Sequence, residues 1–170
     1  MTNKRKDRIP FVKIYLAGPW FNDKQKARTA KASQLLDDND TVALVHMPFD
    51  TQYKDATLDN RKEVFGTFEW QVATCQNDDS AMATSDCAVV LWDMDEPDEG
   101  TAAEIGFMHA NHKPIIIVGF HDKPKDQYEM NLMLARYGTT FIDGEVDFDD
   151  VAKYDFNRFP SSPVSPFPVF

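Results

Sequence analysis

The succession of apolar runs along the chain limits its fold more than any other feature. Five short runs without regular apolar/polar alternation are predicted to be strands, at residues 11–17, 41–47, 87–92, 114–120 and 138–143. Strands without that alternation are buried on both faces, as in a parallel sheet covered by helices. Between them we expect helices over residues 23–36, 64–77, 101–112 and 130–136.

Alternating strands and helices predict an α/β domain. We expect a doubly wound, flavodoxin-like, parallel five-stranded sheet with helices on both faces. Ligands of such sheets bind at the carboxyl ends of the strands, at the switch point between the first and third strands. The loops after Ala17 and Trp92 are therefore expected to face each other across one crevice.

Size and charge narrow the class of partner. The 170 residues suit a single domain spanning residues 1–170. The formal net charge of −10 disfavours nucleic acid polymers and anionic membranes, and leaves small neutral molecules as ligands. No run approaches the ~20 apolar residues of a membrane span. Cys75 and Cys87 form no Cys-x-x-Cys pair and no secretion signal is evident, so we expect a cytoplasmic location.

The two ends of the chain differ in character. Residues 1–9 are highly charged and are expected to form a loose arm. Residues 156–170 contain many Pro and Ser residues, a composition that resembles disorder. This tail nevertheless ends in the apolar sequence PFPVF, so we expect it to dock on the body or on a neighbouring subunit.

Glu104 has two readings. Thr101-x-x-Glu104 matches a capping box, in which Glu104 would bond back to the start of its helix. Its expected place in the first turn of the helix after the third strand also puts it at the crevice. There the helix dipole is expected to keep the carboxylate ionised, which suits a nucleophile.

The acidic pair Asp78 and Asp79 and the aromatic Tyr15 are further candidates for the crevice, and each also has a purely structural interpretation. Asp78 and Asp79 are expected just beyond the end of a helix, where acids oppose the dipole, so a turn or a functional site is possible. Tyr15 is expected in the core, where its phenol would need a partner such as a crevice carboxylate.

The sequence contains no motif that indicates a metal-binding or phosphate-binding site. Residues 93–100 resemble a calcium-binding loop only faintly. Pro97 stands at the fifth position, where a ligand is needed, and Asp98 stands at the sixth, where the sharp turn needs glycine. His109 and His112 lack a His-Glu-x-x-His context. No glycine-rich nucleotide motif is present, and we expect neither a metal nor a cofactor. Two carboxylates with divided roles remain, which is the equipment for cleaving a glycosidic bond with retention of configuration.

Four segments resemble the nucleoside 2-deoxyribosyltransferases of lactobacilli and relatives. They are IYLAGPWF (14–21), ATCQNDD (73–79), DEGTAAEIGFMHA (98–110) and MNLML (130–134). The resemblance covers nearly the whole chain in order. It implies transfer of a 2-deoxyribosyl group between nucleobases, in nucleoside salvage, by a ping-pong route through a covalent deoxyribosyl-enzyme ester. It also implies 2′-deoxynucleosides and free nucleobases as small-molecule partners, and a homo-oligomer, typically a hexamer, with sites shared between subunits.

The resemblance also implies roles for individual residues. Glu104 falls on the nucleophile, Tyr15 on the tyrosine that positions it, and Asp78 and Asp98 on acids that contact the base, one of which protonates the departing base. Asn131 and Met133 fall on positions that enter the neighbouring subunit's site, with Asn131 near the 5′-hydroxyl. The other implied substrate-binding residues are Gly18, Trp20, Phe21, Gln52 and Phe170.

Several alternatives remain open. Phe170 stands where many relatives end in tyrosine, so this chain has no terminal phenol. Gln52 favours acceptance of both purines and pyrimidines, whereas other segments look purine-restricted. Two other functions are compatible with the fold: an N-glycoside hydrolase of nucleoside 5′-monophosphates, which the acidic loops disfavour, and a non-catalytic nucleoside-binding domain in which Glu104 only caps its helix.

Overall fold

The sheet has the predicted topology. The computed structural model describes residues 12–57, 59–159 and 165–170, so the arm expected at residues 1–9 lies outside the described residues. All strand pairs are parallel, in the order β2-β1-β3-β4-β5, which confirms the flavodoxin-like doubly wound α/β class. The strands are β1 (Val12–Ala17), β2 (Val42–His46), β3 (Cys87–Asp93), β4 (Ile115–Phe120) and β5 (Thr140–Asp143).

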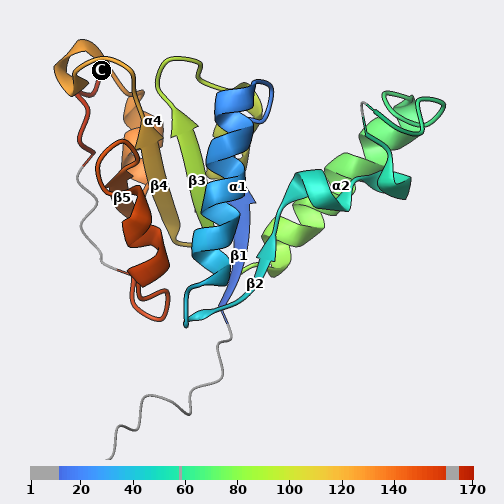
Figure 1. The fold of residues 1–170 in the computed structure, drawn as a ribbon, viewed down its shortest axis with the longest axis horizontal. Helices are drawn as coiled ribbons and strands as arrows, with labels where there is room; N and C mark the ends of the chain where they lie inside the picture. The colour runs from blue at the N-terminus through green and yellow to red at the C-terminus, as the bar shows by residue number, and fades with distance from the viewer. Residues whose placement is uncertain (1–11, 58, 160–164) are drawn as a thin grey trace, which may run out of the picture.

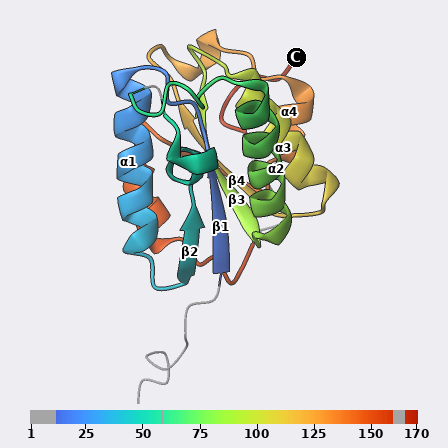
Figure 2. The same ribbon diagram turned by 90° about the vertical axis from the view of Figure 1, so that its right-hand side faces the viewer.

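Helices cover both faces of the sheet (Figure 2). The helices are α1 (Asp23–Asp37), α2 (Phe68–Thr84), α3 (Glu99–Ala110) and α4 (Leu132–Tyr137). Short 3-10 turns occupy Pro48–Thr51, Tyr53–Asp55, Lys125–Gln127 and Phe148–Lys153. On one face, Leu36 of α1 and Phe148 pack in a single apolar cluster with side chains of the sheet. On the other face, Met82 of α2 and Ile105 of α3 pack in the second cluster.

Burial explains why the strand pattern was readable from sequence. Every residue of β3 and of β4 is buried, because helices cover both faces of these central strands. β1 pairs with β2 on one side and with β3 on the other. The loops after β1 and β3 therefore leave the same edge of the sheet at the switch point, as predicted.

Helix α2 is longer than expected. It ends at Thr84, so Asp78 and Asp79 lie inside the helix and the expectation that they follow its end is wrong. The Asn-Asp-Asp-Ser stretch has low helix propensity, but tertiary contacts override it. Lys113 Nζ donates to the carbonyls of Met82 (2.9 Å) and Ala83 (2.6 Å) and thereby satisfies the orphan carbonyls at the true C-terminus.

Much of α2 is not covered by the rest of the chain. The helix projects away from the body in Figure 1, and Met82 is its one fully buried residue. Phe68 is 79% exposed, and Val72 and Leu44 of the edge strand β2 are also exposed. Such large apolar side chains outside a core are typical of protein–protein interfaces.

The last six residues dock on the body. Val169 forms a parallel bridge with Met130, and Phe167 is buried in the cluster that contains α3 and α4. Residues 165–170 of the tail thus lie against the body, while residues 160–164 lie outside the described residues. None of the helices in the described part of the chain is long and apolar enough to span a bilayer.

Candidate active site

A tyrosine and a glutamate from different elements meet at the switch point. The Tyr15 hydroxyl on β1 donates a 2.5 Å hydrogen bond to Glu104 Oε1 on α3. The Tyr15 side chain is fully buried, and its ring stacks on that of His46 with the ring centroids 5.6 Å apart. Tyr15 therefore holds one carboxylate oxygen of Glu104 in a fixed position.

Glu104 does not cap its helix. The N-cap of α3 is Asp98, whose Oδ2 accepts from the Thr101 amide (2.6 Å) and hydroxyl (2.7 Å). Glu104 therefore lies in the second turn, and the expected Thr101–Glu104 capping box and first-turn position are wrong. Asp and Thr both suit an N-cap. Because the Asp98 carboxylate takes that position, the helix begins at Glu99, two residues before the expected start at Thr101.

Burial makes Glu104 a weak acid. It raises the pKa of this carboxyl from 4.5 to about 7, and the Tyr15 hydrogen bond opposes that shift. The charges of Asp78 and Asp98 raise the pKa further. The helix dipole was expected to keep Glu104 ionised, whereas a pKa of about 7 leaves the carboxyl only partly ionised near neutral pH. The same burial, together with the Glu104 charge, raises the pKa of Tyr15, so the phenol stays protonated as a donor.

Asp78 is a second acid with a raised pKa. It is half-buried, and burial followed by the charge of Asp79 raises its pKa from 3.8 to about 6. Its charge raises the pKa values of both Glu104 and Tyr15. Two carboxyl groups that titrate near neutrality thus act on each other across the crevice, an arrangement typical of acid–base sites.

The predicted residues after β1 form an aromatic group. Trp20 contacts Phe21 and Phe49, with ring centroids 5.5 and 4.7 Å apart, and Phe21 is 68% exposed. Gly18 has a packing role, since a Cβ there would lie 2.9 Å from Leu91 Cβ and its φ of +156° disfavours other residues. Phe49 was missed by the sequence reading.

Gln52 is oriented by the backbone. Its Nε2 donates to the Pro48 carbonyl at 2.9 Å, and its Oε1 accepts no hydrogen bond from the described residues. The side chain lies between the two 3-10 turns that follow β2.

Three of the remaining predicted residues line a hollow of about 290 Å³ next to α3. Asp98, Asn131 and Phe170 line it, whereas Glu104 and Tyr15 are not among its lining residues. The Asn131 Oδ1 accepts from the Met133 amide at 2.9 Å and caps α4, so the Asn131 amide nitrogen is directed elsewhere. Met133 is 53% exposed and does not line this hollow. The structure thus forms two groups, one around Glu104 and one around Asn131.

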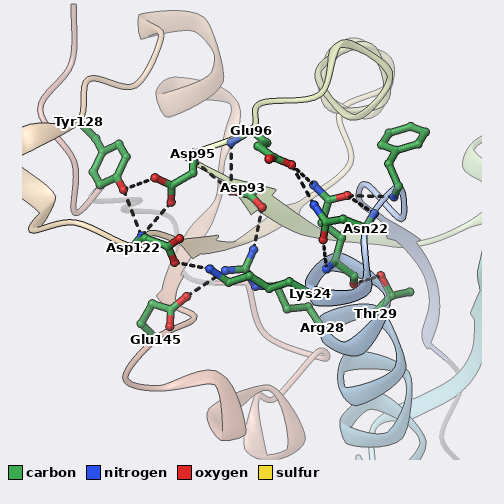
Figure 3. A network of polar contacts seen from close by, with 12 residues as sticks. Asn22, Lys24, Arg28, Thr29, Asp93, Asp95, Glu96, Asp122, Tyr128 and Glu145 are labelled. Atoms are coloured by element: carbon green, nitrogen blue, oxygen red, sulfur yellow. Dashed lines mark hydrogen bonds and ion pairs between the residues drawn. The ribbon is translucent and has the colours of Figure 1, made fainter.

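A polar network fastens the loop after β3 (Figure 3). Arg28 of α1 donates to the buried Asp93 at 2.8 Å, and the other Asp93 oxygen accepts from the amides of Asp95 and Glu96. Asp95 in turn accepts from the Tyr128 hydroxyl at 2.6 Å. Sequence reading missed Arg28, although its spacing of four and eight residues from the buried Ala32 and Leu36 indicated an inward-facing position.

No metal-binding group of His, Cys, Asp and Glu side chains occurs among residues 12–57, 59–159 and 165–170. His112 lies beyond the end of α3 and does not share the helix with His109. The chemistry that the side chains can perform is nucleophilic attack by a positioned carboxylate, assisted by a second carboxyl group that exchanges protons.

Comparisons with known proteins all find one family. Residues 14–133 match the protein-family model described as nucleoside 2-deoxyribosyltransferase. A nucleoside deoxyribosyltransferase of Limosilactobacillus fermentum is 48% identical over 168 residues, covering 98% of this chain and 99% of the relative. One from Lactobacillus leichmannii is 27% identical over 152 residues, covering 88% and 93% of the two chains. The solved structure of a 2-deoxyribosyltransferase from Bacillus psychrosaccharolyticus is 29% identical, with a TM-score of 0.73, and covers 91% of this chain and 100% of that one.

Proposed function

Because this chain belongs to the nucleoside 2-deoxyribosyltransferase family, we propose that it moves the 2-deoxyribosyl group from one nucleobase to another through an ester on Glu104. The observation that carries the proposal is the 2.5 Å hydrogen bond from Tyr15 to the partly buried Glu104, together with Asp78, a second carboxyl group with a raised pKa. We place this activity in cytoplasmic nucleoside salvage.

The reaction proceeds by two displacements. The ionised Glu104 oxygen forms a bond to C1′ as the C1′–N bond breaks, and the departing base keeps the electron pair and takes a proton from Asp78. The acceptor base then loses a proton to Asp78, attacks C1′ and releases Glu104. Two inversions retain the configuration of the nucleoside.

Asp78 suits the proton-donor role better than Asp98 does. The raised pKa of Asp78 keeps part of its population protonated near neutral pH. Asp98 Oδ2 already accepts two hydrogen bonds from Thr101. Asp98 therefore suits the role of a hydrogen-bond acceptor for an N–H or O–H group of the substrate. Gln52 Oε1, also an acceptor, suits an exocyclic amino group of either a purine or a pyrimidine.

The shared site follows from the surface. We propose a homo-oligomer, a hexamer, in which Asn131 and Met133 enter a neighbour's crevice, because Glu104 is not among the residues that line the hollow beside Asn131. The exposed apolar side chains of α2 and β2 supply an interface.

Mass spectrometry without an acceptor base tests reaction class and nucleophile together. After mixing with 2′-deoxyadenosine, we expect a deoxyribosyl adduct on the peptide that contains Glu104 and release of adenine. Release from deoxyadenosine 5′-monophosphate but not from the nucleoside would instead identify a monophosphate hydrolase. Binding without release would identify a nucleoside-binding domain.

Tyr15→Phe should shift the pH dependence of transfer. The Tyr15 hydrogen bond lowers the pKa of Glu104, so its loss raises that pKa above about 7 and leaves less nucleophile ionised at pH 6.5. We expect a drop of about tenfold in kcat at that pH, partly recovered at higher pH. Tyr154→Phe removes a hydroxyl on the opposite face of the sheet, bonded to Thr140, and should leave the profile unchanged. An unshifted Tyr15→Phe profile would remove the tyrosine from the mechanism.

Asn131→Ser separates capping from substrate binding. Serine caps a helix as well as asparagine, but it is too short to present an amide to the substrate. We expect kcat/KM for 2′-deoxyadenosine to fall about tenfold, and that for 2′,5′-dideoxyadenosine, which lacks the 5′-hydroxyl, to stay unchanged. The melting temperature checks the cap. Equal losses on both substrates would contradict a contact to the 5′-hydroxyl.

A further inference from the structure

The last residues of the chain run beside the segment that carries Asn131. We call residues 165–170 the strap. The Met130 amide donates to the Pro168 carbonyl at 2.7 Å, and the Leu132 amide donates to the Phe170 backbone oxygen at 3.2 Å. The two bonds flank Asn131 in sequence, so the strap sets the path of the backbone at that residue. Figure 1 shows the C-terminal end lying beside α4.

One side chain anchors the strap. Phe167 is only 4% exposed, while Phe170 is 66% exposed. The Phe167 ring lies edge-on to His121 and Tyr128, with centroid distances of 5.5 and 6.2 Å. The third wall is Gly119 of β4, where a Cβ would come within 2.9 Å of Phe167 Cε2. The absence of a side chain at Gly119 thus makes room for the phenyl ring.

The walls of this socket are themselves tied to the acidic loop. The Tyr128 hydroxyl donates to Asp95 and accepts from the amides of Asp122 and Lys123. His121 is held by Asp143 at 3.2 Å. Asp95 lies three residues before Asp98, which lines the same hollow as Asn131. The socket therefore links both segments that flank the hollow.

We propose that Phe167 is a positioning residue, which acts through the strap to hold Asn131 where its amide reaches the 5′-hydroxyl of the nucleoside. The inference rests on the proposed transfer function. Phe167 itself touches no substrate. Loss of its ring frees residues 168–170 from Met130 and Leu132, so the backbone at Asn131 loses the two bonds that fix it.

Two variants disturb the anchor from opposite sides. Phe167→Ala removes the ring, and Gly119→Ala places a methyl group in the socket while Phe167 stays intact. The strap, rather than the buried strand, should give way in Gly119→Ala, because the contact is with a side chain alone. Phe159→Ala is the matched control, since that phenylalanine precedes the strap and packs on the cluster of the other sheet face.

The readout is the ratio of kcat/KM for 2′-deoxyadenosine to that for 2′,5′-dideoxyadenosine. For wild type and Phe159→Ala we expect this ratio to be about ten, in favour of the nucleoside with the 5′-hydroxyl. In both anchor variants the ratio should fall to about one, while their activity on 2′,5′-dideoxyadenosine persists. A merely structural role would lower both rates and leave the ratio intact. An unchanged ratio in either folded anchor variant would overturn the inference alone. A wild type without transfer would instead overturn the proposed function.

Discussion

Glu104→Gln should abolish transfer and stabilise the fold. The amide cannot form the ester with C1′, so we expect kcat to fall by more than about a thousandfold with every donor nucleoside. Its oxygen still accepts the Tyr15 hydrogen bond, so the surrounding geometry persists. The adduct on the peptide that contains residue 104 should disappear as well.

The stability gain of Glu104→Gln depends on pH with a definite sign. Because the folded-state pKa of Glu104 is about 7 and its ordinary value is 4.5, the folded state holds this proton more tightly than the unfolded state does. Wild type therefore loses stability as pH rises from about 4.5 to about 7, and the glutamine variant escapes that loss. We expect the variant to be more stable by about 2–3 kcal/mol at pH 8, and equal at pH 4.

Thermal unfolding at several pH values measures this effect. The expected rise in melting temperature at pH 8 is about 5–10 °C for a chain of this size. Glu63→Gln is the matched control, because Glu63 is exposed and lies outside the crevice. A variant with equal stability at all pH values would show that Glu104 is not buried as a weak acid. A variant that keeps most activity would remove Glu104 as the nucleophile.

Asp78→Asn should slow transfer by about a hundred- to a thousandfold, the usual contribution of a general acid. The loss should be small for a donor such as 2-deoxyribosyl fluoride, whose leaving group needs little protonation. Glu104→Gln should lose activity with both substrates, the nucleoside and the fluoride. Comparing the two substrates therefore separates the role of the general acid from that of the nucleophile.

Asp78 also accounts for the expected pH profile. Transfer requires Asp78 protonated and Glu104 ionised, so kcat should be bell-shaped with a maximum between about 6 and about 7, where the coupled pair carries one proton. In Asp78→Asn the fall above pH 7 should vanish. Asp79→Asn is the control. The charge of Asp79 raises the pKa of Asp78, so its removal should lower that pKa and move the pH optimum slightly down, with little change in kcat. A descending limb that survives in Asp78→Asn would exclude it as the acid.

The sequence predicted the sheet well and the helix ends less well. The strands of the central sheet are buried on both faces, so a local pattern was sufficient to find them. The end of α2 depends on Lys113, some thirty residues away, and no local pattern shows that contact. The start of α3 depended on a choice between Asp98 and Thr101 as the cap, which only the path of the preceding loop decides.

The candidate site divides in the same way. The meeting of Tyr15 with Glu104 could be expected from the topology, because both lie near the switch point. The pKa of Glu104 could not, since it depends on how far neighbouring helices exclude water from the carboxylate. Nor could the socket around Phe167, which joins residues from β4, the loop after it and the tail.

The close approach of Gly18 to Leu91 has a bearing on redesign. Libraries that aim to widen the range of accepted sugars or bases should leave this glycine alone, since any side chain would push the first and third strands apart. Diversity is better directed to Phe21 and Phe49, whose rings are substantially solvent-accessible beside the same turn.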